Sequence, residues 1–117
     1  MSDRMRRVNS VLREAIAEQV EELKDPRLGF VTITAVDTAP NLRRATVYYG
    51  VIGTDEQVDG TPDALAAAAP RISAIIGSQV RLKYTPTLTF AKDESLESSA
   101  RITSLLREVS EEPDAEV

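Results

Sequence analysis

Four residues with helical spacing combine basic and small side chains, and their chemistry is that of phosphate binding. Arg71, Ala74, Ser78 and Arg81 follow one another at intervals of three, four and three, which places them on one ridge of a helix. Lys83 comes soon after. Cationic side chains bind phosphate oxygens, and small side chains leave room for a bulky polyanion. The spacing therefore predicts a surface that contacts a nucleic-acid backbone.

A bend is predicted in the same helix, immediately before this ridge. Pro70 lacks the N–H that would bond to the preceding turn, and its ring pushes on that turn. We therefore expect a kink over Ala68–Pro70. The small side chains of Ala68 and Ala69 beside the kink would let an RNA backbone come close.

Other kinds of chemistry have little support in the sequence. The chain has no His and no Cys, so its serines lack the usual activating base and no cysteine metal site is available. Asp93, Glu94 and Glu97 are acids of the kind that bind Mg²⁺, but acids are also expected at the start of a helix. We predict no enzyme activity, no metal site and no cofactor.

The charge of the chain is unevenly distributed. The net charge is −5, but five of the 19 acids lie at or beyond Glu108, which leaves 14 acids against 14 bases in residues 1–107. We expect one domain over residues 1–110 and a disordered acidic tail over 111–117. No apolar run approaches ~18 residues and no signal-peptide core follows Met1, so a cytoplasmic protein without membrane contact is expected.

The first helix is predicted over Asp3–Lys24, with charges of opposite sign on its two sides. Arg6, Arg13 and Lys24 line one edge of its apolar stripe. Glu14, Glu18 and Glu22 form an acidic ridge elsewhere on the helix. This is either an ordinary solvated face or a sorting of charge that keeps acids away from a polyanion.

The remaining elements predict an α+β fold with a three-stranded sheet packed on helices. Strands are expected over Phe30–Asp37, Arg43–Ile52 and Thr87–Ala91, with Val31, Ile33 and Ala35 facing inward in the first. Gly53–Gly60 is expected to be a loop, and Thr61 and Pro62 to be the N-cap and first residue of the kinked helix. A last helix is expected over Ser95–Val109. The order is helix, strand, strand, kinked helix, strand, helix.

One motif that suggests RNA binding is set aside. A Gly-x-x-Gly sequence, as used by KH domains to hold RNA, occurs at Gly50–Gly53, but it lies at a strand end and is not expected to bind RNA.

Two other segments have distinctive sequences. The turn Lys24–Gly29 reads Lys-Asp-Pro-Arg-Leu-Gly, and Arg81–Phe90 is a basic run leading into Pro-x-Leu-x-Phe. In both segments the chain resembles the bacterial ribosome-binding factor A family, and the resemblance extends over about residues 8–109.

The resemblance implies a type II KH-like fold in the order α-β-β-α(kink)α-β-α. It also implies a monomeric ribosome assembly factor that binds the immature 30S subunit and its 16S rRNA during late maturation, with small-subunit ribosomal proteins as further partners. The family has an Ala-x-Gly kink where this chain has Ala68-Ala69-Pro70, so here the glycine is replaced by proline. This should stiffen the bend and remove one backbone donor.

The residues expected to contact RNA lie in the first helix, the turn after it, the kink and the ridge beyond the kink. Arg27 is open to two interpretations, as an RNA contact or as a cap on the end of the first helix. The alternative for the whole chain is a small α+β protein-interaction or dimerisation module that binds no nucleic acid. The predicted RNA-binding residues are Arg6, Arg13, Arg27, Ala68, Ala69, Pro70, Arg71, Ala74, Ser78, Arg81 and Lys83.

Overall fold

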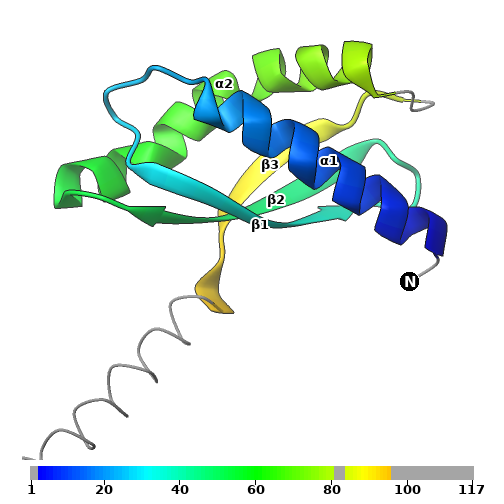
Figure 1. Cartoon of the computed structure of the whole chain (residues 1–117), viewed down its shortest axis with the longest axis horizontal. Helices are drawn as coiled ribbons and strands as arrows, with labels where there is room; N and C mark the ends of the chain where they lie inside the picture. Colours follow the sequence, from blue (N-terminus) through cyan, green and yellow to red (C-terminus); the bar gives the residue numbers. More distant parts are fainter. Residues whose placement is uncertain (1–2, 81–83, 96–117) are drawn as a thin grey trace, which may run out of the picture.

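The computed structural model describes residues 3–80 and 84–95, and both of its long helices lie on the same side of one sheet (Figure 1). The predicted order of elements and the three-stranded α+β architecture are confirmed over this part of the chain. The elements are α1 (Asp3–Glu21), β1 (Phe30–Thr38), β2 (Arg44–Ile52), α2 (Asp55–Gln79) and β3 (Thr87–Lys92).

The sheet has the strand order β1-β2-β3, with β1 antiparallel to β2 and β3 parallel to β2. The register between β1 and β2 skips Thr34, which forms a bulge. A bulge reverses the alternation of side chains beyond it. For this reason Val36 is buried and Ala35 is exposed, so the prediction that Ala35 faces inward is wrong.

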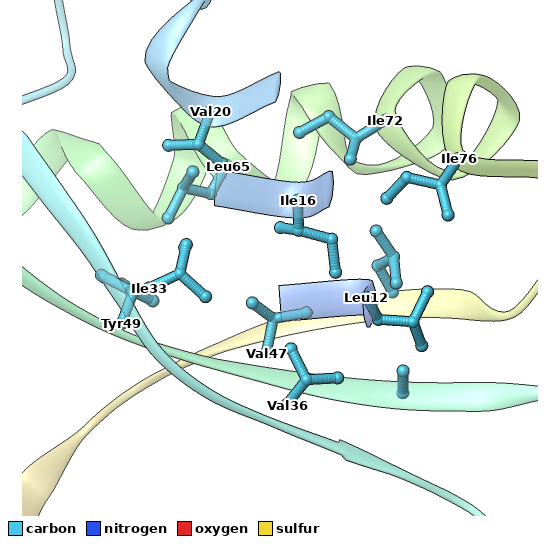
Figure 2. Packing of buried hydrophobic residues seen from close by; sticks show 12 residues of the cluster. Leu12, Ile16, Val20, Ile33, Val36, Val47, Tyr49, Leu65, Ile72 and Ile76 are labelled. Atoms are coloured by element: carbon cyan, nitrogen blue, oxygen red, sulfur yellow. The ribbon is translucent and has the colours of Figure 1, made fainter. Parts of the chain in front are cut away.

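The hydrophobic core lies between the helices and the inner face of the sheet (Figure 2). From α1 it receives Leu12, Ile16 and Val20, which recur every four residues and form one stripe, as predicted. Burial of such side chains is the main source of stability in a domain of this size. The sheet and α2 contribute Ile33, Val36, Ala45, Val47, Tyr49, Leu65, Ile72, Ile76 and Leu88.

Helix α2 begins at Asp55, seven residues before the predicted first helical residue, Pro62. Its N-cap is Thr54, whose hydroxyl accepts from the Gln57 N–H at 3.2 Å, while the Gln57 side chain accepts from the Thr54 N–H at 3.0 Å. This is a capping box, which satisfies two N–H groups at the helix start. The prediction of a loop over Gly53–Gly60 and of Thr61 as N-cap is therefore wrong, and Thr61 is a fully buried residue inside the helix.

Pro70 lies within α2 and does not interrupt it, since the helix is continuous from Asp55 to Gln79. Figure 1 shows α2 changing direction along its length, as a proline inside a helix favours. The residues after Pro70 return to the core through Ile72 and Ile76. The second half of α2 therefore stays anchored to the sheet, and its exposed side carries the predicted ridge.

The chain after β3 begins a helical turn at Glu94. The carboxylate of Asp93 accepts from the N–H of Ser95 at 3.0 Å, and its other oxygen accepts from the Thr34 hydroxyl. The acid at this position thus acts as a helix cap. The rest of the predicted last helix and the acidic tail lie outside the described residues.

Within residues 3–80 and 84–95 the long helices are α1 and α2. Neither long helix is apolar enough over a sufficient length to cross a bilayer. Within the same residues, no group of three or more acids gathers in a way that could hold a metal ion.

Candidate nucleic-acid interface

The predicted ridge lies on the exposed side of α2. Arg71, Ala74 and Ser78 are all exposed, and the Ser78 hydroxyl donates to the carbonyl of Ile75 at 2.7 Å. Because that hydroxyl is hydrogen-bonded within its own helix, the main feature of Ser78 on the ridge is its small side chain. Arg81 and Lys83, which would extend the ridge, lie outside the described residues.

The three residues of the predicted kink differ in exposure. Pro70 is exposed, whereas Ala68 and Ala69 are half-buried and pack against the core. Only part of each alanine is therefore open to a ligand. What an RNA backbone would meet here is chiefly the ring of Pro70, followed by the guanidinium of Arg71.

A groove of about 390 Å³ lies between the end of α1 and the second half of α2, and it brings two basic residues together. We call it the Lys24–Arg71 groove. Lys24 comes from the turn after α1, and Arg71 from the start of the ridge. Glu22 lines the same groove, so the acidic side of α1 is not held away from it. The groove can therefore hold an anion between two cations, with one acid at its rim.

Arg6 and Arg13 lie on a different edge of α1. Asn9 stands three residues after the first and four before the second, so all three share one side of the helix. The Asn9 side chain accepts from the N–H of Thr38 at 3.0 Å, which shows that this side faces the end of β1. Gln19, which lines the Lys24–Arg71 groove, is on the other edge. Arg6 and Arg13, both predicted to bind RNA, therefore lie on a different edge of α1 from the groove that contains Arg71.

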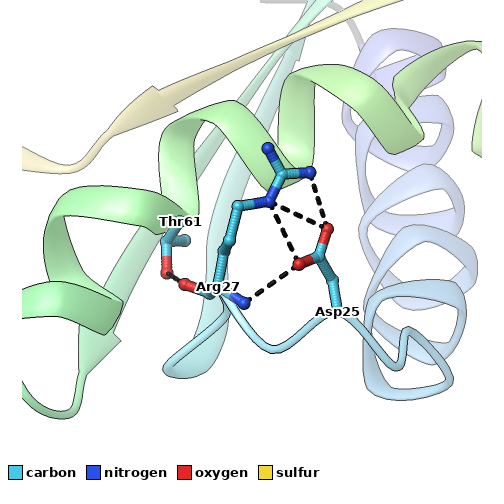
Figure 3. Close-up of polar contacts among 3 residues, drawn as sticks. All are labelled: Asp25, Arg27 and Thr61. Carbon is cyan, nitrogen blue, oxygen red and sulfur yellow. Dashed lines mark hydrogen bonds and ion pairs between the residues drawn. The ribbon is translucent and has the colours of Figure 1, made fainter.

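Arg27 is held within its own turn (Figure 3). Its Nη2 atom donates to Oδ2 of Asp25 at 2.7 Å, and its backbone N–H donates to Oδ1 at 2.9 Å. These hydrogen bonds lower the pKa of Asp25 and raise that of Arg27. The sequence left two roles open for Arg27, an RNA contact or a structural cap on the first helix. The contacts of Arg27 are structural, but its partner is the carboxylate of Asp25 and not the carbonyls at the end of α1.

The same turn docks on the first half of α2. The Gly29 N–H donates to the Thr61 hydroxyl at 3.0 Å, and that hydroxyl donates to the Gln57 carbonyl at 2.6 Å. Gly60 permits the approach, because a Cβ at this position would lie 3.1 Å from the Cβ of Arg27. The Lys-Asp-Pro-Arg-Leu-Gly turn therefore fixes where Lys24 stands relative to α2.

Sequence reasoning missed two groupings of basic residues. The pairing of Lys24 with Arg71 depends on how α1 and α2 pack, and no local pattern encodes it. A second grouping places Arg4 and Arg43 beside Tyr84, with the Arg43 guanidinium 4.2 Å from the centroid of the Tyr84 ring. The sequence did contain a signal for this second grouping, because Tyr84 belongs to the basic run that precedes β3.

These features define a class of protein: a small KH-like α+β domain with exposed basic grooves beside a proline-containing helix. The family model for ribosome-binding factor A matches residues 4–106. Curated ribosome-binding factors A from Desulfitobacterium hafniense and Rubrobacter xylanophilus are 42% and 44% identical to the chain, covering 95% and 96% of it and 90% and 93% of their own lengths. The chain belongs to the ribosome-binding factor A family.

Solved structures agree with this assignment. The crystal structure of ribosome-binding factor A from Thermus thermophilus superposes with a TM-score of 0.68 at 28% identity, covering 75% of this chain and 94% of that one. The solution structure of the Thermotoga maritima protein, described as a putative ribosome-binding factor A, gives 0.69 at 29% identity and covers 80% and 90%. A further match, with a TM-score of 0.62 and 29% identity over 74% and 91%, is a Thermus thermophilus homology model fitted into a cryo-EM map of a 30S complex.

Proposed function

We propose that this protein binds the immature small ribosomal subunit in the cytoplasm and assists late maturation of its 16S rRNA, without chemistry of its own. Membership of the ribosome-binding factor A family supports the proposal, as does the similarity to a Thermus thermophilus relative that was fitted into a map of its 30S complex. The expected contacts are with phosphates, which set the orientation of the protein on folded RNA.

The observation that carries the proposal is the Lys24–Arg71 groove. Two cations from separate elements line one groove of about 390 Å³, and the exposed small residues Ala74 and Ser78 continue from it along α2. A phosphate backbone fits such a place because its charge is neutralised while no large side chain blocks its path. Arg6 and Arg13 would at most touch RNA that wraps around α1.

A matched pair of variants tests this assignment. The double variant Lys24→Glu with Arg71→Glu should weaken co-sedimentation with small subunits from a strain that lacks the protein. The double variant Arg6→Glu with Arg13→Glu changes the net charge equally but acts on the other edge of α1, and should weaken it much less. Equal losses for the two would mean that overall charge, and not this groove, determines binding.

One observation favours a second candidate function, that of a protein-interaction module. Phe30 and Ile52 are paired across β1 and β2 and are 72% and 75% exposed. Exposed apolar pairs of this kind are common at protein interfaces. Under this candidate, binding to small subunits would be insensitive to salt and to Lys24→Glu with Arg71→Glu, but would be lost on replacing Phe30 and Ile52 by serine.

A further inference from the structure

A second groove, of about 580 Å³, lies at the end of the molecule where α1 begins. It is bounded by the start of α1, by the loop between β1 and β2, and by Tyr84 just before β3. We call it the Arg43–Tyr84 groove. Its volume lies within the range of about 300–1,000 Å³ that is usual for small-ligand sites.

The Arg43 side chain is stacked on an aromatic ring. Its guanidinium carbon lies 4.2 Å from the centroid of the Tyr84 ring, which is a cation–π arrangement. A guanidinium placed over a ring has a second face on which a further planar group can stack. The pair thus forms a short stacking platform beside an open groove.

The backbone that carries Arg43 is fixed on both sides. The Arg43 N–H donates to the Asn41 side chain at 3.0 Å, and its carbonyl accepts from the Thr87 N–H at 2.9 Å. The preceding Leu42 is buried and has a left-handed φ of 63°, an unusual conformation for a residue other than glycine. Because this backbone is already fixed by hydrogen bonds, the platform loses less conformational entropy when a ligand binds.

The lining of the groove combines positive charge with apolar walls. Arg4 and Arg43 line it together with Met5 and Leu42, and none of its described lining residues is acidic. Met5 is half-buried, and it lines this groove. An occupant should therefore have a flat apolar part and a negative charge.

We propose that the Arg43–Tyr84 groove binds one unpaired nucleotide of RNA. The base stacks on the Arg43–Tyr84 platform against Met5 and Leu42, and the phosphate contacts Arg4. Single-stranded RNA is commonly bound by stacking of splayed bases on aromatic rings and guanidinium planes. The proposal rests on the proposed function for the source of the RNA, but it concerns a different surface from the Lys24–Arg71 groove and adds contact with an unpaired base.

Arg44 supplies a matched control for the proposed site. It carries the same charge as its neighbour and is also exposed, but it starts β2. Ala45, the next residue, faces the core, so the alternation of β2 directs Arg44 to the outer face of the sheet. Arg43→Ala and Arg44→Ala thus remove equal charge from adjacent positions, and only the first removes the stacked guanidinium.

The experiment measures binding of the full chain to a fluorescent single-stranded oligouridylate of about twelve nucleotides, a length that spans a typical single-strand site. A duplex RNA of the same length is the comparison. Arg43→Ala and Tyr84→Leu should each reduce affinity for the single strand by about fivefold or more, the usual range for the loss of one stacked base. Tyr84→Phe and Arg44→Ala should stay close to wild type, and thermal melts should show all four variants folded.

Four results would overturn the proposal. Equal losses of affinity for Arg43→Ala and Arg44→Ala would mean that the charge alone, and not the stacked guanidinium, accounts for binding. Equal effects of Arg43→Ala on single strand and duplex would indicate phosphate contact alone. An oligoglutamate peptide that bound with the same dependence on Arg43 and Tyr84 would assign the groove to a protein partner. If the single strand bound independently of Arg43 while Lys24→Glu with Arg71→Glu still released small subunits, the proposed function would stand and this site would fall.

Discussion

The backbone N–H of Gly29 donates to the hydroxyl of Thr61 at 3.0 Å, across 32 positions of sequence. This bond joins the turn that carries Lys24 to the helix that carries Arg71. Because Thr61 is fully buried, its hydroxyl has no water as an easy substitute for this bond. The position of one cation relative to the other therefore depends on a polar contact well away from both.

Thr61→Val should destabilise the fold by about 1–3 kcal/mol, because it leaves the Gly29 N–H without its acceptor while nearly preserving side-chain volume. Thr38 is the matched control. It is also buried, but its hydroxyl has no hydrogen-bond partner within the described residues, so Thr38→Val should be neutral or stabilising. Urea unfolding of the two variants checks this, and a larger loss for Thr38→Val would contradict the assigned contacts.

The Asp25–Arg27 pair predicts a pH dependence of stability. Hydrogen bonds from Arg27 lower the pKa of Asp25 from its ordinary value of 3.8. A lowered carboxyl pKa stabilises the folded state above the unfolded-state value, and this contribution is lost as the pH falls through the folded-state value. The difference in unfolding free energy between wild type and Asp25→Asn should therefore shrink below about pH 4.

Asp59→Asn is the control for that measurement, since it removes one exposed negative charge from α2 without breaking the arginine pair. Denaturant unfolding over a series of pH values would provide the comparison. The same pH dependence for both variants would show that the pair contributes nothing specific. The absolute effect near neutral pH should be small, because the pair is largely exposed to solvent.

Close packing between Gly77 and Thr85 predicts a coupled pair of substitutions. A Cβ at Gly77 would lie 2.5 Å from the Thr85 hydroxyl oxygen and 3.1 Å from its methyl carbon. Gly77→Ala alone should therefore be strained, although alanine favours a helix over glycine by about 1 kcal/mol. Thr85→Ala removes both obstructing atoms, so the double variant should be more stable than the two single changes predict.

A thermodynamic cycle over these four proteins measures the coupling. We expect a favourable interaction energy of about 0.5–3 kcal/mol between the two alanines. Additive effects would mean that the end of α2 does not pack on the segment leading into β3. That segment carries Tyr84, so the result also bears on the Arg43–Tyr84 groove.

Much of the fold could be predicted because periodic apolar residues dominate it. The four-residue spacing of Leu12, Ile16 and Val20 specified the buried face of α1, and the alternation in β2 specified its inner face. The start of α2 was missed although its capping box, Thr54 to Gln57, is visible in the sequence. Pro62 is typical of a first helical position, but the burial of its neighbours Thr61 and Leu65 holds it inside the helix.

The candidate site was predicted less completely, since it depends on how helices pack. Local spacing correctly placed Arg71, Ala74 and Ser78 on an exposed ridge. It could not show that Arg6 and Arg13 lie on the β1 side of α1, or that Lys24 and Arg71 line one groove. The bulge at Thr34, which turns Ala35 outward, likewise has no sequence signal stronger than a threonine in a strand.

The most direct test of the central claim is the salt dependence of affinity for small subunits that lack the protein. Phosphate contacts release bound counterions, so log affinity of the wild type should fall linearly with log salt. Lys24→Glu with Arg71→Glu should bind more weakly with a shallower slope, while Arg6→Glu with Arg13→Glu should keep nearly the wild-type slope. A slope that is flat for the wild type, or unchanged by reversal of charge at Lys24 and Arg71, would contradict the assignment of this groove to ribosomal RNA.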